Sequence, residues 1–215
     1  MRKLATIVAL ALGSAVHAAQ TVLFNESAAY ECYQAALHGG GSEFDIEPCT
    51  RALEHQAMNV VDRAATHSNR GLLYARSGDY AEAMRDHDRA VNLAPEIDSI
   101  LINRSNTLVR LKRFEQAMQD LEQAIGFEGE ARAHAHYNRA LLFYRLGDRQ
   151  SARMDAEMAA EIAPERPGYQ RYLRMLELEQ EVADSEAAEG VALPTQESNV
   201  QDLNREPQVP SPDEP

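Results

Sequence analysis

The chain has 215 residues and a formal net charge of −13, with 21 Lys and Arg side chains against 34 Asp and Glu. Nucleic-acid binding relies on clustered basic side chains that release counterions from phosphates, so this acidic balance argues against a nucleic-acid partner. After the first 18 residues, no stretch is apolar for long enough to cross a bilayer, and we expect no permanent membrane span.

Residues 1–18 have the layout of a secretory signal peptide. Met1–Lys3 is a short basic head, Leu4–Val16 is an apolar run, and small residues precede a cleavage position after Ala18. This layout predicts an exported protein that is periplasmic or secreted. The alternative is an uncleaved N-terminal anchor, for which the apolar run is short.

The next segment, residues 19–63, contains both cysteines of the chain, Cys32 and Cys49. A close pair in an oxidising compartment suggests a disulfide. Closing a loop of this size would stabilise the fold by about 3 kcal/mol in the chain-entropy model. Two buried thiols are the alternative. A structural metal site is not predicted, because four clustered nitrogen or sulfur ligands do not surround the pair.

The same segment has the pattern of two helices, Ala28–Leu37 and Asp45–Met58, joined by a glycine-rich loop. Asp45 is a plausible N-cap of the second helix, and Pro48 is tolerated in a first turn. The glycine run lacks the Gly-Lys-Ser/Thr ending and the preceding strand of a phosphate-binding loop. We therefore interpret it as a flexible connection.

Residues 64–166 carry one pattern three times, which is the feature that most limits the choice of fold. An Asn-Arg-small triplet recurs at offsets of 34 and 35 residues, as Asn69-Arg70-Gly71, Asn103-Arg104-Ser105 and Asn138-Arg139-Ala140. After each triplet come an aromatic residue or Leu, a turn and two spaced alanines. These are Tyr74, Leu108 and Phe143; turns at 78–80, 112–114 and 147–149; and Ala83 with Ala90, Ala117 with Ala124, and Ala152 with Ala159.

The pattern closely resembles the small–aromatic–Gly–Ala–Ala–Pro signature of the tetratricopeptide repeat family, with units at 64–97, 98–132 and 133–166. The resemblance implies an all-α, right-handed solenoid of helical hairpins, here in an exported bacterial member of the family. The middle unit departs from the signature in having Ser105, Lys112 and Gly129 where Gly, Gly and Pro are usual. Its hairpin would therefore be differently angled.

Both ends of the repeat array need caps with a polar outer surface. Residues 19–63 look like a degenerate N-terminal repeat that serves as one cap, with Cys32 and Cys49 tying its two helices together. Residues 167–180 are predicted to form a capping helix at the other end, with Tyr172, Met175 and Leu176 facing inward.

An Arg and an Asp recur 16 residues apart in each unit, one on each helix of the hairpin. Such a recurring pair indicates a structural, bidentate bridge between packed helices rather than a functional site. The pairs are Arg70 with Asp86, Arg104 with Asp120, and Arg139 with Asp155.

The family resemblance also implies a concave groove for a peptide. Three asparagines at the family's groove position could clamp peptide amides, and three arginines seven residues further on could form a row that receives an acidic group. Tyr137 and Tyr144 would add an apolar floor, with Ile102 and Val109. The polar groove residues are Asn69, Asn103, Asn138, Arg76, Arg110 and Arg145. The alternatives are that Asn is simply common at this position and that Arg complements the helix dipole.

Other functions have little support in the sequence. A carboxylate clamp would need basic residues where Ala65 and Ser99 stand. His134 and His136 point in different directions on one helix, which argues against a metal site. No set of nucleophile, acid and base stands out, so we predict neither catalysis nor a cofactor.

Residues 181–215 contain nine acidic residues, one Arg and five prolines, without any aromatic residue. This composition predicts a disordered tail, which acts either as a spacer or as a competitor for a basic groove.

The leading hypothesis is a periplasmic, non-enzymatic scaffold that binds a peptide or an envelope protein, an acidic one included, in its concave groove. The alternative is a structural or assembly factor that acts by self-association or by anchoring to the cell wall.

Overall fold

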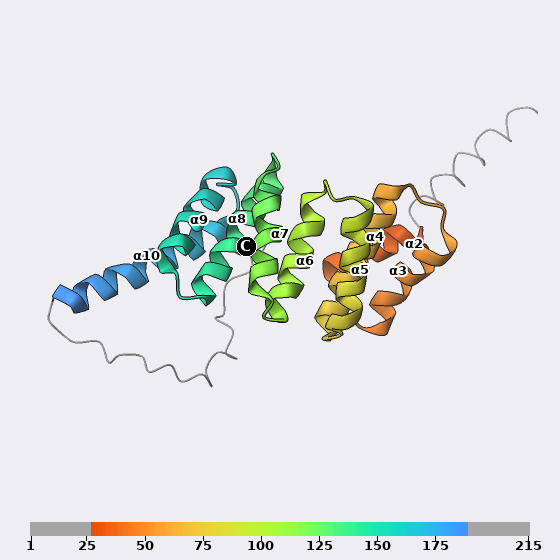
Figure 1. The fold of residues 1–215 in the computed structure, drawn as a ribbon, viewed down its shortest axis with the longest axis horizontal. Helices are drawn as coiled ribbons and strands as arrows, with labels where there is room; N and C mark the ends of the chain where they lie inside the picture. The colour runs from red at the N-terminus through yellow and green to blue at the C-terminus, as the bar shows by residue number, and fades with distance from the viewer. Residues whose placement is uncertain (1–26, 189–215) are drawn as a thin grey trace, which may run out of the picture. The chain divides into compact units, whose positions relative to one another are not determined.

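A computed structural model describes residues 27–188, which contain nine α-helices, labelled α2 to α10, and no strand (Figure 1). They belong to two compact units, one ending at Glu96 and the other beginning at Ile97. Both units are built from helical hairpins, and the predicted all-α class is confirmed. The predicted signal peptide, and the acidic tail from residue 189 onwards, lie outside the described residues.

The first unit contains two hairpins. Helix α2 (Ala28–His38) packs against α3 (Glu43–His55), and α4 (Val60–Ser77) packs against α5 (Tyr80–Leu93). The second helix ends earlier than predicted. It also begins differently, because Ser42 rather than Asp45 is the N-cap.

Asp45 takes part in that cap as the third helical residue. Its backbone N–H donates to Ser42 Oγ, and its carboxylate accepts from the Ser42 backbone, which completes a capping box. Pro48 lies in the second turn rather than the first, still within the helix. In the sequence, the start of α3 is indicated by Ser42 followed three residues later by the acidic Asp45.

The second unit has two hairpins and a final helix. These are α6 (Asp98–Arg110) with α7 (Phe114–Ile125), α8 (Glu130–Arg145) with α9 (Arg149–Ile162), and then α10 (Pro167–Ala188). Helix α8 begins three residues before the predicted boundary of the third unit. Helix α10 continues to Ala188, so the predictions of an end at 180 and of disorder from 181 are wrong for residues 181–188.

Small side chains allow the two helices of a hairpin to approach closely. All six alanines predicted from the repeats are fully buried. At Gly71 the fit is closest, since an added Cβ would lie 2.8 Å from the buried ring of His87. Glycine is therefore required at this position by the neighbouring helix rather than by its own backbone.

The turn inside each repeat hairpin requires a left-handed residue. Gly78 and Gly147 adopt φ values of 87° and 86°, and Asp79 and Asp148 follow as N-caps of α5 and α9. The middle turn keeps the same backbone shape without the favourable residues. Lys112 has a φ of 58°, and the next residue gives helix α7 no side-chain cap. Left-handed backbone costs a non-glycine residue about 1 kcal/mol.

Candidate functional site

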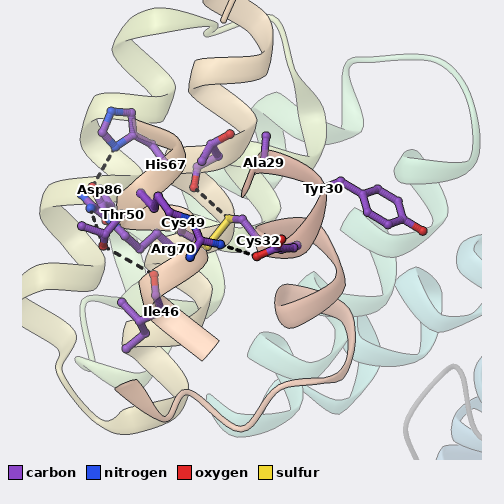
Figure 2. The surroundings of a disulfide bond; sticks show 12 residues. Ala29, Tyr30, Cys32, Ile46, Cys49, Thr50, His67, Arg70 and Asp86 are labelled. Carbon is purple, nitrogen blue, oxygen red and sulfur yellow. Dashed lines mark hydrogen bonds and ion pairs between the residues drawn. A yellow bond between two sulfur atoms is a disulfide. The ribbon is translucent and has the colours of Figure 1, made fainter. Parts of the chain in front are cut away.

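A buried cluster of charged side chains joins three helices of the first unit (Figure 2). Arg70 on α4 donates from Nε to Asp86 Oδ2 at 2.6 Å and from Nη2 to Oδ1 at 3.0 Å. His67 Nδ1 lies 2.8 Å from the same Oδ1, and Arg70 Nη1 reaches Thr50 Oγ1 of α3 at 3.1 Å. The predicted pair is therefore the centre of a larger network.

The second unit repeats the Arg–Asp–His part of this arrangement in one hairpin and the Arg–Asp pair in another. Arg139 binds Asp155 in bidentate fashion at 2.6 and 2.9 Å, and His136 Nδ1 lies 2.8 Å from the same carboxylate. In the middle hairpin Arg104 binds Asp120 at 2.8 and 2.6 Å. The buried Leu101 stands there at the place of the histidine.

The burial and the lowered pKa values of the aspartates indicate that these clusters are structural ion pairs between the helices of a hairpin. Asp86 and Asp155 are only 2% and 4% exposed. Burial alone would raise the pKa of each carboxyl. Hydrogen bonds and charge from Arg70 and His67, or from Arg139 and His136, outweigh it and hold both pKa values below the usual range. The carboxylates are thus kept ionised while linking the two helices of a hairpin.

The structure forms the predicted bond between Cys32 of α2 and Cys49 of α3, whose Cα atoms are 4.6 Å apart. Both cysteines are fully buried against Leu73 of α4. Figure 2 shows Tyr30, on the same helix as Cys32, pointing away from the disulfide. The bond thus lies in the small core that joins the first hairpin to the second.

Arg76, which is predicted to line the groove wall, is exposed and hydrogen-bonded to α2. Its Nη1 donates to the carbonyl oxygens of Ala36 and Gly39, at 2.7 and 2.8 Å. These carbonyls lie at the carboxyl end of α2, where the helix leaves acceptors unpaired. Arg76 therefore ties α2 to α4.

The two predicted groove tyrosines also have internal roles, both against α10. Tyr137 is buried, and its ring centroid lies 4.9 Å from that of Tyr169 and 5.3 Å from that of Tyr172. Burial raises the pKa of Tyr137 to about 12. Tyr144 donates its hydroxyl to Glu179 at 2.7 Å, and the Arg149 guanidinium stacks on its ring. Tyr137 is therefore covered by α10 and does not form an open groove floor, whereas Tyr144 stays partly exposed and its groove role remains a prediction.

What remains of the predicted polar groove lies mainly in the second unit, where α6 packs against α8. Asn103 and Asn138 occupy corresponding positions on these two helices and are both partly exposed. Arg110 and Arg145, two turns further along, are exposed. Asn69 holds the corresponding position on α4 in the first unit and is also partly exposed. The second unit thus presents two Asn–Arg pairs on neighbouring helices.

Sequence reasoning missed the histidines of the clusters. His67 and His136 each stand three residues before the repeat arginine, so the repeat pattern contained the signal. In the sequence, His136 is instead a candidate metal ligand together with His134, a role that their different directions on the helix argue against. His134 Nδ1 lies 2.7 Å from the Tyr169 hydroxyl, and His136 faces Asp155. Within residues 27–188, no group of three or more His, Cys, Asp or Glu is arranged to hold a metal ion.

Across the same described range, none of the helices combines the length and the apolar character needed to span a bilayer.

Comparison with known proteins identifies the repeats. Residues 64–97 and 98–129 match the family model of the tetratricopeptide repeat. The chain is 31% identical over 122 residues to the tetratricopeptide repeat protein 36 homolog of Drosophila pseudoobscura pseudoobscura, covering 55% of this chain and 61% of that protein.

Two further relatives match over a smaller part of their length. Stress-induced-phosphoprotein 1 of Caenorhabditis elegans is 30% identical over 40% of this chain and 27% of its own. The mitochondrial import receptor subunit TOM70 of Homo sapiens is 24% identical over 74% of this chain and 25% of its own. The chain thus spans 61% of the first of these relatives and about a quarter of each of the other two.

Proposed function

Since this chain belongs to the tetratricopeptide repeat family, we propose that it is a non-enzymatic scaffold that binds another protein. Its binding surface is the face of α6 and α8 in the second unit. The partner supplies an extended peptide segment that carries an acidic group. One relative is named an import receptor subunit, which favours a role in protein recognition.

The observation that carries the proposal is the repetition of Asn and Arg on two adjacent helices. Asn103 and Asn138 offer one carboxamide each, and a carboxamide both donates to and accepts from a peptide unit. Arg110 and Arg145 lie two turns beyond them and are exposed to solvent. Successive repeats thus offer the same two contacts at successive positions along a bound peptide.

The chemistry of the surface suggests which side chains orient a bound peptide and which hold its backbone. Guanidinium groups bind carboxylates in a planar, two-point fashion, so the arginines would select an acidic residue and set its position. The asparagines would hold the backbone without reading side chains. Charge attraction of this kind speeds association and weakens as salt rises.

Two features support a periplasmic or secreted location, which is part of the proposal. The Cys32–Cys49 disulfide is of the kind that persists in oxidising compartments. The first 18 residues have the sequence layout of a signal peptide. Fusion of residues 1–18 to a reporter that is active only after export tests the location directly. A reporter that stays inactive and unprocessed contradicts it.

Affinity capture with the full mature chain, read by mass spectrometry, tests the binding surface. One bait carries Arg110→Glu and Arg145→Glu, while a matched control carries the same change at Arg113 and Arg153, which are exposed on the α7 and α9 side of the hairpins. We expect a partner that is captured by the parent and the control but lost from the first variant.

Two readouts separate failure of binding from failure of folding. Circular dichroism should give the same helix content and melting temperature for all three baits, because the substituted side chains are exposed. A partner kept by the Arg110/Arg145 variant and lost from the Arg113/Arg153 control contradicts the proposed face. A partner lost from both baits equally shows that charge alone, rather than this surface, governs capture.

A further inference from the structure

Helix α10 has two apolar faces, and the first packs against the rest of the second unit. Tyr169, Tyr172 and Leu176 are buried against the hairpin of α8 and α9. The second face runs along the outer flank and contains Met175, partly buried, with Leu178 and Val182, which are 46% and 57% exposed. A shallow apolar depression lies along this second face.

The residues of the second face have the spacing of a helix–helix seam. Arg171, Met175, Leu178, Val182 and Ser185 follow one another at alternating intervals of four and three residues. This alternation, carried here for about two heptads, keeps one stripe facing a partner helix along its length. Three of these five positions are apolar, Met175, Leu178 and Val182, and a helix that packs along them would cover all three at once.

We propose that this seam binds α10 of a second copy of the chain, in antiparallel orientation, with Leu178 packed near Leu178 of the other copy. The distribution of charge along the helix favours this arrangement. Both arginines of the helix, Arg171 and Arg174, lie before Leu178 together with Glu177, whereas the residues after it include four acids and no base, so the helix changes from weakly basic to strongly acidic along the seam.

Arg174 and Glu181 decide the orientation. They lie on the same flank of the seam, one about a turn before Leu178 and the other about a turn after it. Antiparallel pairing therefore brings Arg174 of each copy level with Glu181 of the other, which gives two symmetric ion pairs. Parallel pairing in register would instead bring Arg174 beside Glu179 of the other copy, a carboxylate that already accepts from Tyr144 and lies 3.6 Å from Arg149 in its own unit.

Within a single copy of α10, the side chains of Arg174 and Glu181 already lie close to each other on this flank of the seam. Arg174 Nη1 lies 3.1 Å from Glu177 and 3.8 Å from Glu181 of its own helix, with Arg174 well exposed. A seam of about two heptads buries less surface than a standard protein–protein interface. The dimer is thus a weak, reversible one whose population depends on concentration. It uses a surface other than the α6–α8 face and does not depend on the proposed function.

Sedimentation or light scattering of the full mature chain, over a roughly 100-fold range of concentration, tests the proposal. We expect the mean mass to rise from monomer toward dimer. Leu178→Glu should remain monomeric, because it places two carboxylates at the centre of the seam. Leu146→Glu is the matched control, since Leu146 is an equally exposed leucine outside the seam, and it should associate like the parent.

A charge exchange tests the antiparallel geometry. Arg174→Glu and Glu181→Arg should each abolish association, because each creates like charges across the seam. The double variant should restore it, because the pairs re-form with reversed polarity. A parent that is monomeric at every concentration overturns the proposal. So does a Leu178→Glu variant that dimerises normally, and a double variant that stays monomeric overturns the antiparallel arrangement.

Discussion

The first hairpin and helix α10 are attached to their respective units by different kinds of interaction. Helices α2 and α3 share a core of small side chains, with the Cys32–Cys49 bond at its centre, and leave Tyr33 and Phe44 exposed. Helix α10 has no covalent link and buries Tyr169 and Tyr172 against Tyr137. One attachment is therefore sensitive to reduction, and the other to loss of side-chain volume.

Aromatic residues stabilise the two ends of this chain to different degrees. A buried aromatic side chain removes a large apolar area from water, whereas an exposed one of the same type contributes little to folding. The first hairpin cannot obtain that contribution from small residues, and a cross-link compensates by limiting the unfolded chain.

The largest expected effect is on the aromatic attachment. Tyr172→Ala removes a fully buried ring and should destabilise the second unit by about 3–5 kcal/mol. Tyr30→Ala, an exposed tyrosine on α2, is the control and should change stability by about 0.5 kcal/mol or less. Denaturant unfolding followed by circular dichroism measures both. Equal effects would mean that the aromatic packing of α10 is not what holds it.

The Asp–Arg–His clusters, which both units share, should show a smaller and similar effect. Asp86→Asn and Asp155→Asn leave a largely buried guanidinium without its counter-charge, and each should cost about 3 kcal/mol. If only one substitution destabilises the protein, the two clusters are not equivalent despite their matching geometry.

Acid should weaken the same clusters. The folded pKa of each carboxyl lies below its unfolded value of about 3.9, so the stability it supplies is fully present above that pH. It is lost as pH falls through the folded pKa, that is, below about pH 4. Each Asn variant should lose the part of the parent's acid sensitivity due to its carboxyl, which a pH series of denaturant midpoints measures.

The disulfide should contribute somewhat less. Replacing both Cys32 and Cys49 by Ala is expected to cost about 2–3 kcal/mol, because the unfolded first unit regains the freedom of the closed loop. Hydrogen exchange should then increase in α2 and α3 and stay unchanged in α10. Faster exchange in α10 as well would show that the two attachments are coupled.

The smallest effect concerns the middle turn. Lys112→Gly should stabilise the protein by about 1 kcal/mol, because glycine adopts the positive φ that lysine adopts under strain. Gly147→Lys, the reverse change in the next hairpin, is the matched control and should destabilise by a similar amount. A thermal melt resolves both signs, and a stabilising Gly147→Lys would contradict the argument.

Much of the fold could be predicted because the repeat leaves its register in the sequence. The 16-residue spacing of Arg70 from Asp86 placed the two side chains on facing helices, and the structure brings them into contact. Lys112 departed from the signature in sequence and is the non-glycine residue that adopts positive φ within the described chain. These features depend on local backbone geometry and on one hairpin at a time.

The functional surface could not be predicted to the same degree. Arg76 and Tyr137 occupy groove positions by register, yet Arg76 caps α2 and Tyr137 lies under α10. Register fixes the face of a helix on which a residue lies, but not whether another element covers that face. Arg76 stays exposed while it binds α2, and Tyr137 is covered by α10, and both of these contacting helices lie outside the three repeats.

The sequence by itself therefore determined the hairpins, their order and the charged pairs within them, because residues of one hairpin are close in sequence and obey one period. Only the tertiary structure decided which repeat positions remain open to a partner. That outcome depends on packing between segments distant in sequence, such as α10 on α8, whose mutual fit is set by side-chain volume rather than by spacing.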